Sequence, residues 1–393
     1  MLSKKISQIT PSYTIGISTK VKALKEQGRN IINLSIGEPD FFIPEKATER
    51  GIEAFNTNQT KYDVVPGLMT LREAIVEKLK TENGVHYAPS DIVVSSGAKH
   101  AITNALMAML DPGDQVIVPV PYWTSYPEMI KLCGGVPVFV DTKKENQFKL
   151  KLEDLKKSIT DHTKMIFINN PSNPTGAVYT REELTPIVTY CAENDIYILS
   201  DEIYEKICYV SEYTSIPSIS DKVKEMTIIV NGLSKSAAMT GLRIGYTAST
   251  PEIAKAISTI QGHLVSHPSL ASQWAGLGAL KESHDEINQM VAIYKERREA
   301  LVEQLKTMSG IDFITPDGAF YLYLDLSSIK SKVIHTDSFS VKVCDELLEQ
   351  YDLAVVPGIA FGTDDYIRIS YATELGLVQE GLRRIQQFIQ SKK

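Results

Sequence analysis

The chain has 393 residues, of which 43% are hydrophobic and 23% are charged, and its formal net charge is −7 at pH 7. This length exceeds what one hydrophobic core usually supports, so we expect a large domain and a smaller one. The net negative charge, without any block of consecutive basic residues, argues against a nucleic-acid partner, and no apolar run approaches the length that a membrane span needs.

The start of the sequence and the cysteines bear on the cellular compartment. The first residues contain no apolar h-region and no small-residue cleavage site, so the sequence predicts a cytoplasmic protein without a secretory signal. The cysteines lie far apart without a C-x-x-C spacing and are interpreted as structural thiols. They are Cys133, Cys191, Cys208 and Cys344.

Residues 1–45 are predicted to form an N-terminal arm and part of the smaller domain. They contain Pro11, Gly37, Pro39 and Pro44 and have too little apolar periodicity to fold alone. We expect them to lie across the smaller domain or across a partner subunit.

Residues 46–285 are predicted to form the large domain, an α/β unit with a mostly parallel sheet. Between about residues 90 and 250, short β-branched runs alternate with helical patterns, which is typical of parallel β-α-β units. The strand-like runs are residues 92–94, 116–118, 136–140, 165–168, 196–199 and 227–230.

Residues 286–393 are predicted to form a smaller α+β domain. A long polar helix pattern passes through residues 294–298, and two strand-like runs cover residues 320–324 and 366–370. A final amphipathic helix pattern is centred near Ile385.

Polar residues directly follow several of the predicted strands. Ligands of open α/β sheets bind outside the carboxyl ends of the strands, so these residues are candidates for one shared site. The small-residue turn of residues 95–100 opens a helix whose free N–H groups can hold a phosphate. The later turns and the segment beyond them supply Asn173, Asp201, Tyr204, Lys235 and Arg243.

This set of groups matches the chemistry of pyridoxal phosphate. The aldehyde of that cofactor needs a lysine amine, its pyridine nitrogen needs a carboxylate to stay protonated, and its phosphate needs N–H donors and a cation. The sequence therefore predicts a pyridoxal-phosphate site in which Lys235 forms the Schiff base with the cofactor.

The motifs around these residues resemble those of the class I aminotransferases of fold type I. The match is carried by residues 170–176 (NPSNPTG), 200–204 (SDEIY) and 232–245 (GLSKSAAMTGLRIG). Residues 38–41, 121–128 and 368–373 extend it over nearly the whole chain. Among the subgroups, the chain is most similar to the bacterial aspartate aminotransferases called class Ib. The resemblance implies a large domain with a mostly parallel sheet and a smaller α+β domain.

The resemblance also implies a role for each matching residue. Lys235 would hold the cofactor and move the proton between substrate Cα and cofactor C4′, and Asp201 would pair with the pyridine nitrogen. Tyr204 and Asn173 would hydrogen-bond the ring oxygen, and Trp123 would stack on the ring. Asn173 and Trp123 would also contact the substrate.

Other matching residues would hold the anionic groups of the cofactor and the substrate. Arg243 would bind the phosphate together with the amides of Gly97 and Ala98. Arg368 would clamp the substrate α-carboxylate through a fork geometry that a lysine cannot reproduce. Gly37 would let the backbone approach that carboxylate closely.

The remaining matches bear on assembly and specificity. Tyr62 would reach the phosphate of the other subunit's cofactor, so that a homodimer shares its active sites. Lys99 would reach the distal carboxylate of aspartate or glutamate. The resemblance thus implies a cytoplasmic, homodimeric transaminase with a ping-pong cycle, which we expect to use aspartate and 2-oxoglutarate.

Other functions stay open. The same motifs are compatible with a transaminase of aromatic, alanine or prephenate specificity and with a C–S lyase. A non-catalytic module that binds pyridoxal phosphate is a further alternative. Ser96 and Lys99 match the S-x-x-K pattern of serine acyl-transfer enzymes, but no K-T-G accompanies them. His263 and His267 lack the glutamate of the zinc-protease motif, so no metal site is predicted.

Overall fold

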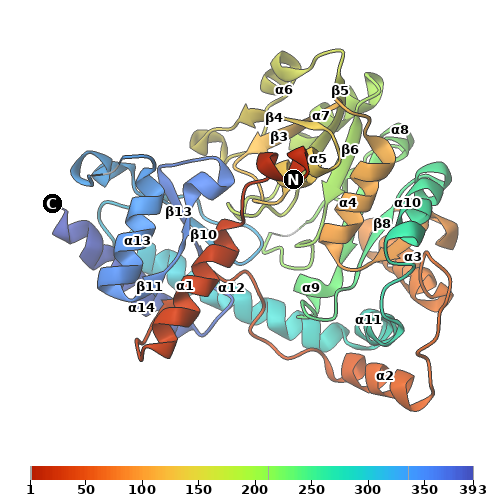
Figure 1. Cartoon of the computed structure of the whole chain (residues 1–393), viewed down its shortest axis with the longest axis horizontal. Helices are drawn as coiled ribbons and strands as arrows, with labels where there is room; N and C mark the ends of the chain where they lie inside the picture. The colour runs from red at the N-terminus through yellow and green to blue at the C-terminus, as the bar shows by residue number, and fades with distance from the viewer. Residues whose placement is uncertain (1, 211, 335, 393) are drawn as a thin grey trace.

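The computed structural model describes residues 2–210, 212–334 and 336–392. That part of the chain contains a large sheet of seven strands in the order β2-β8-β7-β6-β5-β3-β4 (Figure 1). Neighbouring strands are parallel except at β8, which is antiparallel to β2 and β7. The strands are β2 (Ile92–Ser95), β3 (Gln115–Val120), β4 (Val136–Asp141), β5 (Thr163–Asn169), β6 (Tyr197–Asp201), β7 (Thr227–Gly232) and β8 (Gly245–Ala248). The fold is therefore α/β with a mostly parallel sheet, as predicted.

Helices cover both faces of this sheet. Along β5, Met165 and Phe167 belong to the core under α4, α5 and α10, whereas Ile166 and Ile168 belong to the core under α6, α7 and α8. A strand that is buried on both faces needs apolar residues at successive positions, which explains the continuous runs in the sequence. The helices of this part are α2 (Glu45–Asn56), α3 (Met69–Asn83), α4 (Ala98–Met109), α5 (Tyr126–Leu132), α6 (Leu152–Ser158), α7 (Arg181–Glu193), α8 (Asp221–Glu225), α9 (Leu233–Ser236), α10 (Pro251–Leu264) and α11 (Leu270–Glu282).

Local sequence signals set the ends of these helices. At the start of α7, Thr180 Oγ1 accepts a hydrogen bond from the amide of Glu183, and the Glu183 carboxylate accepts one from the amide of Thr180. Such a reciprocal pair satisfies N–H groups that the helix itself leaves free. Helix α3 ends at Gly84, whose φ of 66° lies in the left-handed region that glycine adopts without strain.

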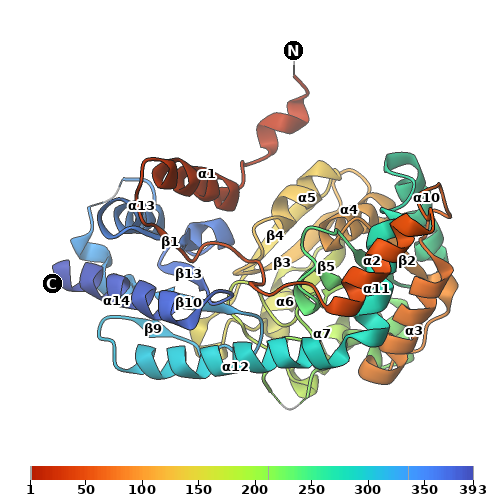
Figure 2. The same cartoon turned by 90° about the horizontal axis from the view of Figure 1, so that it is seen from below.

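A smaller sheet has the order β12-β13-β10-β9, with α12, α13 and α14 around it. Figure 2 shows α12 extending from the helices beside the large sheet to this smaller sheet. The elements are α12 (His284–Lys306), β9 (Asp312–Phe313), β10 (Tyr321–Asp325), α13 (Phe339–Tyr351), β11 (Leu353–Ala354), β12 (Val356–Pro357), β13 (Tyr366–Ser370) and α14 (Leu375–Ser391). Short 3-10 turns lie at Lys4–Gln8, Pro89–Asp91, Lys144–Asn146, Ile216–Ser218, Ser327–Lys332 and Gly358–Phe361. The predicted α+β unit is confirmed, and its limits at residues 45 and 285 stay a prediction.

Part of the N-terminal segment packs on the smaller unit, whereas its first residues contact α5 of the large one, where the amide of Thr10 donates a hydrogen bond to Glu128 at 2.9 Å. Strand β1 (Ile32–Asn33) pairs in parallel with β11, and α1 (Tyr13–Glu26) packs Val21 against Leu348 and Ala354. None of the helices among the described residues is long and apolar enough to span a membrane.

Every predicted strand-like run falls on an observed strand. The two-residue strands β1, β9, β11 and β12 were not predicted, and neither was β8 in the large sheet. Its four residues include a glycine, an alanine and Thr247 as the only β-branched side chain. Such a short segment has no clear strand signal of its own. It is a strand because β2 and β7 supply hydrogen-bond partners on both sides.

Candidate active site

A cavity of about 750 Å³ opens where the carboxyl ends of the large sheet meet α1, β10 and β13. Of the residues singled out from the sequence, its wall contains Gly37, Ala98, Lys99, Trp123, Asn173, Asp201, Tyr204, Lys235, Arg243 and Arg368. Gly97 stands directly before the wall residue Ala98. Tyr62 does not line this cavity in its own chain and is 92% exposed, with its ring edge-on to His267 at 6.1 Å.

Lys235 lies in α9, directly after β7, with its amine in the cavity. Its Nζ donates a hydrogen bond to the carbonyl of Gly37 at 2.6 Å. Burial lowers the pKa of this amine to about 8, although the nearby Glu38 opposes the shift. An amine with this pKa is neutral in roughly one molecule in ten at pH 7, far more often than an ordinary lysine, which favours its action as a nucleophile.

Asp201 is the last residue of β6, and its carboxylate is buried at the floor of the cavity. Its Oδ2 accepts a hydrogen bond from the hydroxyl of Tyr126 at 2.6 Å, and its Oδ1 accepts one from the amide of Ile203 at 3.2 Å. Burial raises the pKa of this carboxyl to about 6, against the opposing hydrogen bonds. A cationic N–H group in the cavity would stabilise the charged form.

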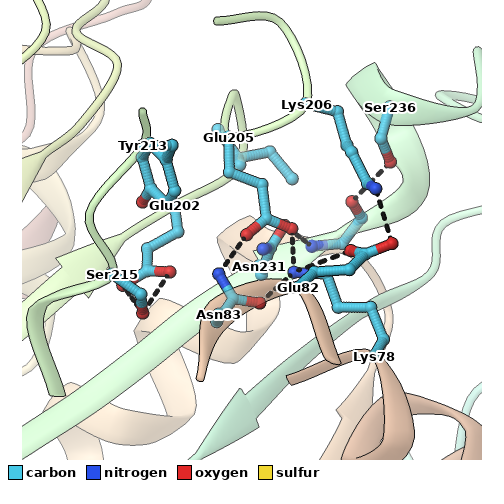
Figure 3. Close-up of polar contacts among 12 residues, drawn as sticks. Lys78, Glu82, Asn83, Glu202, Glu205, Lys206, Tyr213, Ser215, Asn231 and Ser236 are labelled. Atoms are coloured by element: carbon cyan, nitrogen blue, oxygen red, sulfur yellow. Dashed lines mark hydrogen bonds and ion pairs between the residues drawn. The ribbon is translucent and has the colours of Figure 1, made fainter. Parts of the chain in front are cut away.

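The turn after β6 is also held by buried polar contacts of residues that do not line the cavity (Figure 3). The fully buried Glu202 accepts hydrogen bonds from the hydroxyls of Ser200 and Ser215, each at 2.8 Å. Burial, followed by repulsion from Glu205, raises the pKa of Glu202 to about 7. These contacts fix the residue next to Asp201.

Glu205 anchors the other end of the same turn. Its carboxylate forms an ion pair with Lys78, and each of these two side chains is only 7% exposed. The carboxylate also accepts a hydrogen bond from Asn83 at 2.9 Å (Figure 3). Although burial raises the pKa of the Glu205 carboxyl, Lys78 and Asn83 outweigh it and hold that pKa below its usual range. Asp201 and Tyr204 therefore face the cavity from a turn whose opposite side is tied to α3.

Arg368 projects from β13 into the cavity with part of its guanidinium already engaged. Its Nη1 donates to Asn173 Oδ1 at 3.0 Å and its Nη2 donates to the carbonyl of Ser35 at 2.9 Å. Its Nε is buried and has no partner among the described residues. These two contacts orient the guanidinium plane and leave donors free for an anion.

The start of α4 and Arg243 form a second positively charged region of the cavity. Gly97 precedes the helix with a φ of 85°, and a Cβ at this position would overlap the Arg243 guanidinium. Arg243 Nη1 donates to the carbonyl of Thr240 at 2.9 Å, and within residues 2–210, 212–334 and 336–392 no carboxylate pairs with it. Free helix N–H groups beside an unpaired guanidinium suit a phosphate.

Lys99, in the first turn of α4, lines the cavity beside Trp123. Its Nζ lies 5.1 Å from the centroid of the Trp123 ring. Burial and then the charge of Arg243 lower the pKa of Lys99. Helix α1 contributes Ile15 and Lys22 to the wall.

Sequence reasoning missed Tyr126 and Tyr321 as members of this site. Tyr126 bonds Asp201 across 75 positions of sequence, and Tyr321 contacts Tyr204 across 117 positions. The motif at residues 121–128 marked the region of Tyr126, but no local spacing shows which side chain a tyrosine meets. The contribution of α1 to the wall was likewise not predicted.

Comparisons with known proteins decide the family. Residues 29–385 match the family model described as aminotransferase class I and II. An aspartate aminotransferase from Bacillus sp. strain YM-2 is 43% identical, and the match covers 99% of both chains. A probable aspartate/prephenate aminotransferase from Aquifex aeolicus is 45% identical over 99% of this chain and 98% of its own. The structure of Thermus thermophilus aspartate aminotransferase with maleate has a TM-score of 0.93 and 38% identity, covering 98% of this chain and 99% of that one.

The chain belongs to the class I and II aminotransferases. The predicted fold, enzyme class and cofactor are confirmed, so the protein is an aminotransferase that depends on pyridoxal phosphate. Membership of this family argues against two alternative hypotheses, namely a serine acyl-transfer enzyme and a non-catalytic module that binds the cofactor. It also confirms the similarity to bacterial aspartate aminotransferases.

The cavity of this aminotransferase fits the cofactor. Pyridoxal phosphate supplies an aldehyde that condenses with amines and a ring that withdraws electrons from the substrate Cα. Lys235 offers an amine of lowered pKa, Asp201 offers a buried carboxylate without a direct cationic contact among the described residues, and Arg243 with the start of α4 offers an anion site.

The lowered pKa of Lys235 predicts how the apoenzyme captures its cofactor. The second-order rate of capture should fall about tenfold for each pH unit below about 8 and level off above that pH, because only the neutral amine attacks the aldehyde. Stopped-flow absorbance between pH 6 and 10 measures this rate. The same titration with N-α-acetyl-lysine corrects for ionisation of the cofactor. A corrected midpoint near 10.5, the ordinary lysine value, would contradict the expectation.

Proposed function

We propose that this aminotransferase moves the amino group of aspartate to 2-oxoglutarate by a ping-pong cycle. The proposal is carried by two cations, Lys99 and Arg368, which line one cavity from α4 and from β13. Within the described part of the chain, neither forms an ion pair with a carboxylate. Aspartate and 2-oxoglutarate each carry two carboxylates, so both partners of the reaction match this pair. The Thermus thermophilus relative was solved with maleate, which is also a dicarboxylate.

We assign the central steps to residues at the end of the large sheet. Lys235 holds the cofactor and carries the proton between substrate Cα and cofactor C4′. Asp201 keeps the pyridine nitrogen protonated, and Tyr126 supports Asp201 through its hydroxyl. Tyr204 donates a hydrogen bond to the ring oxygen, and Trp123 covers the ring.

The remaining cavity residues bind the anionic groups. Arg243 and the amides of Gly97 and Ala98 hold the phosphate. Arg368 holds the substrate α-carboxylate. Asn173 hydrogen-bonds the ring oxygen, and its Oδ1 accepts a hydrogen bond from Arg368 that orients the guanidinium. We assign Gly37 to the α-carboxylate side of the cavity; a side chain there would overlap the Tyr321 hydroxyl, so this close approach of the backbone requires glycine.

Replacing Lys99 with alanine tests the substrate assignment. The loss of a charge-assisted hydrogen bond, about 1.5–3 kcal/mol, should lower kcat/KM for aspartate on the order of 10- to 150-fold. The value for phenylalanine should change far less, because only the dicarboxylate loses a partner. Lys22→Ala is the matched control, since Lys22 lines the same cavity from α1 and should cause a smaller loss. An equal loss for aspartate and phenylalanine would place Lys99 on the cofactor phosphate instead.

A second candidate substrate is prephenate, because the Aquifex aeolicus relative is described as a probable aspartate/prephenate aminotransferase. Prephenate is an oxo acid with two carboxylates, so the same pair of cations would suit it. Turnover with a panel of oxo acids, each at saturating aspartate, separates the two specificities.

We further propose a cytoplasmic homodimer in which Tyr62 reaches the cofactor phosphate of the other subunit. Tyr62 is 92% exposed, and Phe42 and Phe55 are 99% and 65% exposed. Aromatic side chains are enriched at protein–protein interfaces. All four cysteines are free, which fits a reducing compartment. The mass of the holoenzyme in solution tests the dimer.

A further inference from the structure

Tyr321 occupies a position between the two ends of the proposed active site. It lies on β10 opposite Ser370 of β13, two positions along that strand from Arg368. It lines the cavity although only 1% of it is exposed. Its hydroxyl oxygen is 2.7 Å from that of Tyr204, and the Arg368 guanidinium lies 4.4 Å from its ring centroid. One side chain therefore contacts both the proposed donor to the ring oxygen and the proposed carboxylate clamp.

The backbone at Gly37 also rests against Tyr321. A Cβ at Gly37 would overlap the Tyr321 hydroxyl, so this close approach requires glycine. The carbonyl of Gly37 accepts the hydrogen bond from Lys235. Tyr321 thus contacts the segment that orients the lysine as well.

The direction of the hydrogen bond between the two tyrosines follows from counting protons. Burial raises the pKa of both Tyr204 and Tyr321, so each hydroxyl keeps its single proton. If Tyr204 donates its proton to the ring oxygen, the proton between the two tyrosines must come from Tyr321. Hydrogen bonds in such a chain polarise one another, so donation by Tyr321 makes Tyr204 a stronger donor.

We propose that Tyr321 is a positioning residue that strengthens the hydrogen bond from Tyr204 to the cofactor ring oxygen and supports the plane of Arg368 through its ring. This inference rests on the proposed role of Tyr204 and adds a residue to which the sequence motifs assigned no role. The hydroxyl and the ring of Tyr321 have separate effects, so two substitutions can separate them.

Tyr321→Phe removes the hydroxyl and keeps the ring. The visible absorbance of the bound cofactor titrates with pH as the nitrogen that links it to Lys235 loses its proton. After this nitrogen loses its proton, the ring oxygen depends on the hydrogen bond from Tyr204. A weaker hydrogen bond from Tyr204 therefore disfavours the deprotonated form. The midpoint should therefore rise by roughly 0.1 to 0.7 pH units, the equivalent of weakening one charge-assisted hydrogen bond by about 10–30%. The KM for aspartate should stay near the wild-type value.

Tyr321→Leu removes the ring as well. Its midpoint should rise as in Tyr321→Phe, and its KM for aspartate should also rise, roughly 2- to 30-fold, as expected for losing a cation–π contact. Tyr323→Phe is the matched control, because Tyr323 lies on the same strand, is equally buried and bonds Thr363 instead. It should leave both the midpoint and the KM unchanged.

Titration of Tyr204→Phe in parallel separates this inference from the proposed function. A raised midpoint in Tyr204→Phe and in Tyr321→Phe, with none in Tyr323→Phe, supports it. A Tyr321→Phe midpoint within about 0.1 pH unit of wild type overturns the inference alone if Tyr204→Phe is shifted. An unshifted Tyr204→Phe overturns the role of Tyr204 and the inference with it. Equal KM values for aspartate in Tyr321→Leu and Tyr321→Phe overturn the support of Arg368 by the ring.

Discussion

Lys235→Ala is expected to lose nearly all transamination while the protein remains folded. In the proposed mechanism, the substitution removes both the amine that holds the cofactor and the group that carries the proton from substrate Cα, and positioned proton transfer alone contributes about 10² to 10⁴-fold. We therefore expect kcat to fall on the order of 10⁴-fold or more. A keto-acid product assay with aspartate and 2-oxoglutarate measures this loss, and circular dichroism checks the fold.

A chemical readout complements the assay of Lys235→Ala. Borohydride reduction followed by mass spectrometry should find the cofactor covalently attached to the wild type and not to the variant. Lys222→Ala is a suitable control, because Lys222 is an exposed lysine on α8. Transamination at the wild-type rate by Lys235→Ala would end the proposed mechanism.

Asp201→Asn should bind the cofactor and lose most of its turnover. The substitution keeps the shape of the side chain but removes the charge that, in the proposed mechanism, holds the pyridine nitrogen protonated. Loss of one preorganised electrostatic group elsewhere costs about 2.7–4 kcal/mol, so we expect kcat to fall roughly 10²- to 10³-fold. Tyr126→Phe keeps the carboxylate and loses only its hydrogen bond, so its effect should be smaller. A kcat within about threefold of wild type would show that Asp201 does not have this role.

Asp201→Asn should not destabilise the apoenzyme at pH 7. Burial raises the pKa of Asp201 to about 6 from an ordinary 3.8. An acid whose pKa is higher in the folded state loses its contribution to stability as pH rises through that window, because the folded protein must then bury a charge. Asparagine avoids that cost. Thermal unfolding of the apoenzyme should give Asp201→Asn a Tm equal to or above that of the wild type, whereas a lower Tm would contradict this account.

The strands of the large sheet were predictable because their signal is local. Residues 165–168 and 227–230 are buried on both faces, so their positions are continuously apolar and need no knowledge of the partner strand. Strand β8 was not predictable, because its four residues become a strand through the neighbours β2 and β7. The contribution of α1 to the cavity wall equally depends on how distant segments pack.

The sequence by itself determined the chemistry of the site. Lys235, Asp201 and Asn173 each lie within five residues of the end of a strand-like run, and the carboxyl ends of parallel strands must meet at one edge of the sheet. Residue type then indicates the cofactor, because an amine, a carboxylate and a phosphate site are what pyridoxal phosphate requires. These inferences need only residue identity and strand direction.

Only the tertiary structure decided which side chains touch. Arg368 meets Asn173 across 195 positions, and Tyr204 meets Tyr321 across 117 positions, through the packing of β13 and β10 against the end of the large sheet. The direction of a side chain in such a contact depends on strand register and on the rotamer that neighbouring atoms allow. Those constraints come from residues far away in the chain, so no local pattern around Tyr321 could reveal its place between Tyr204 and Arg368.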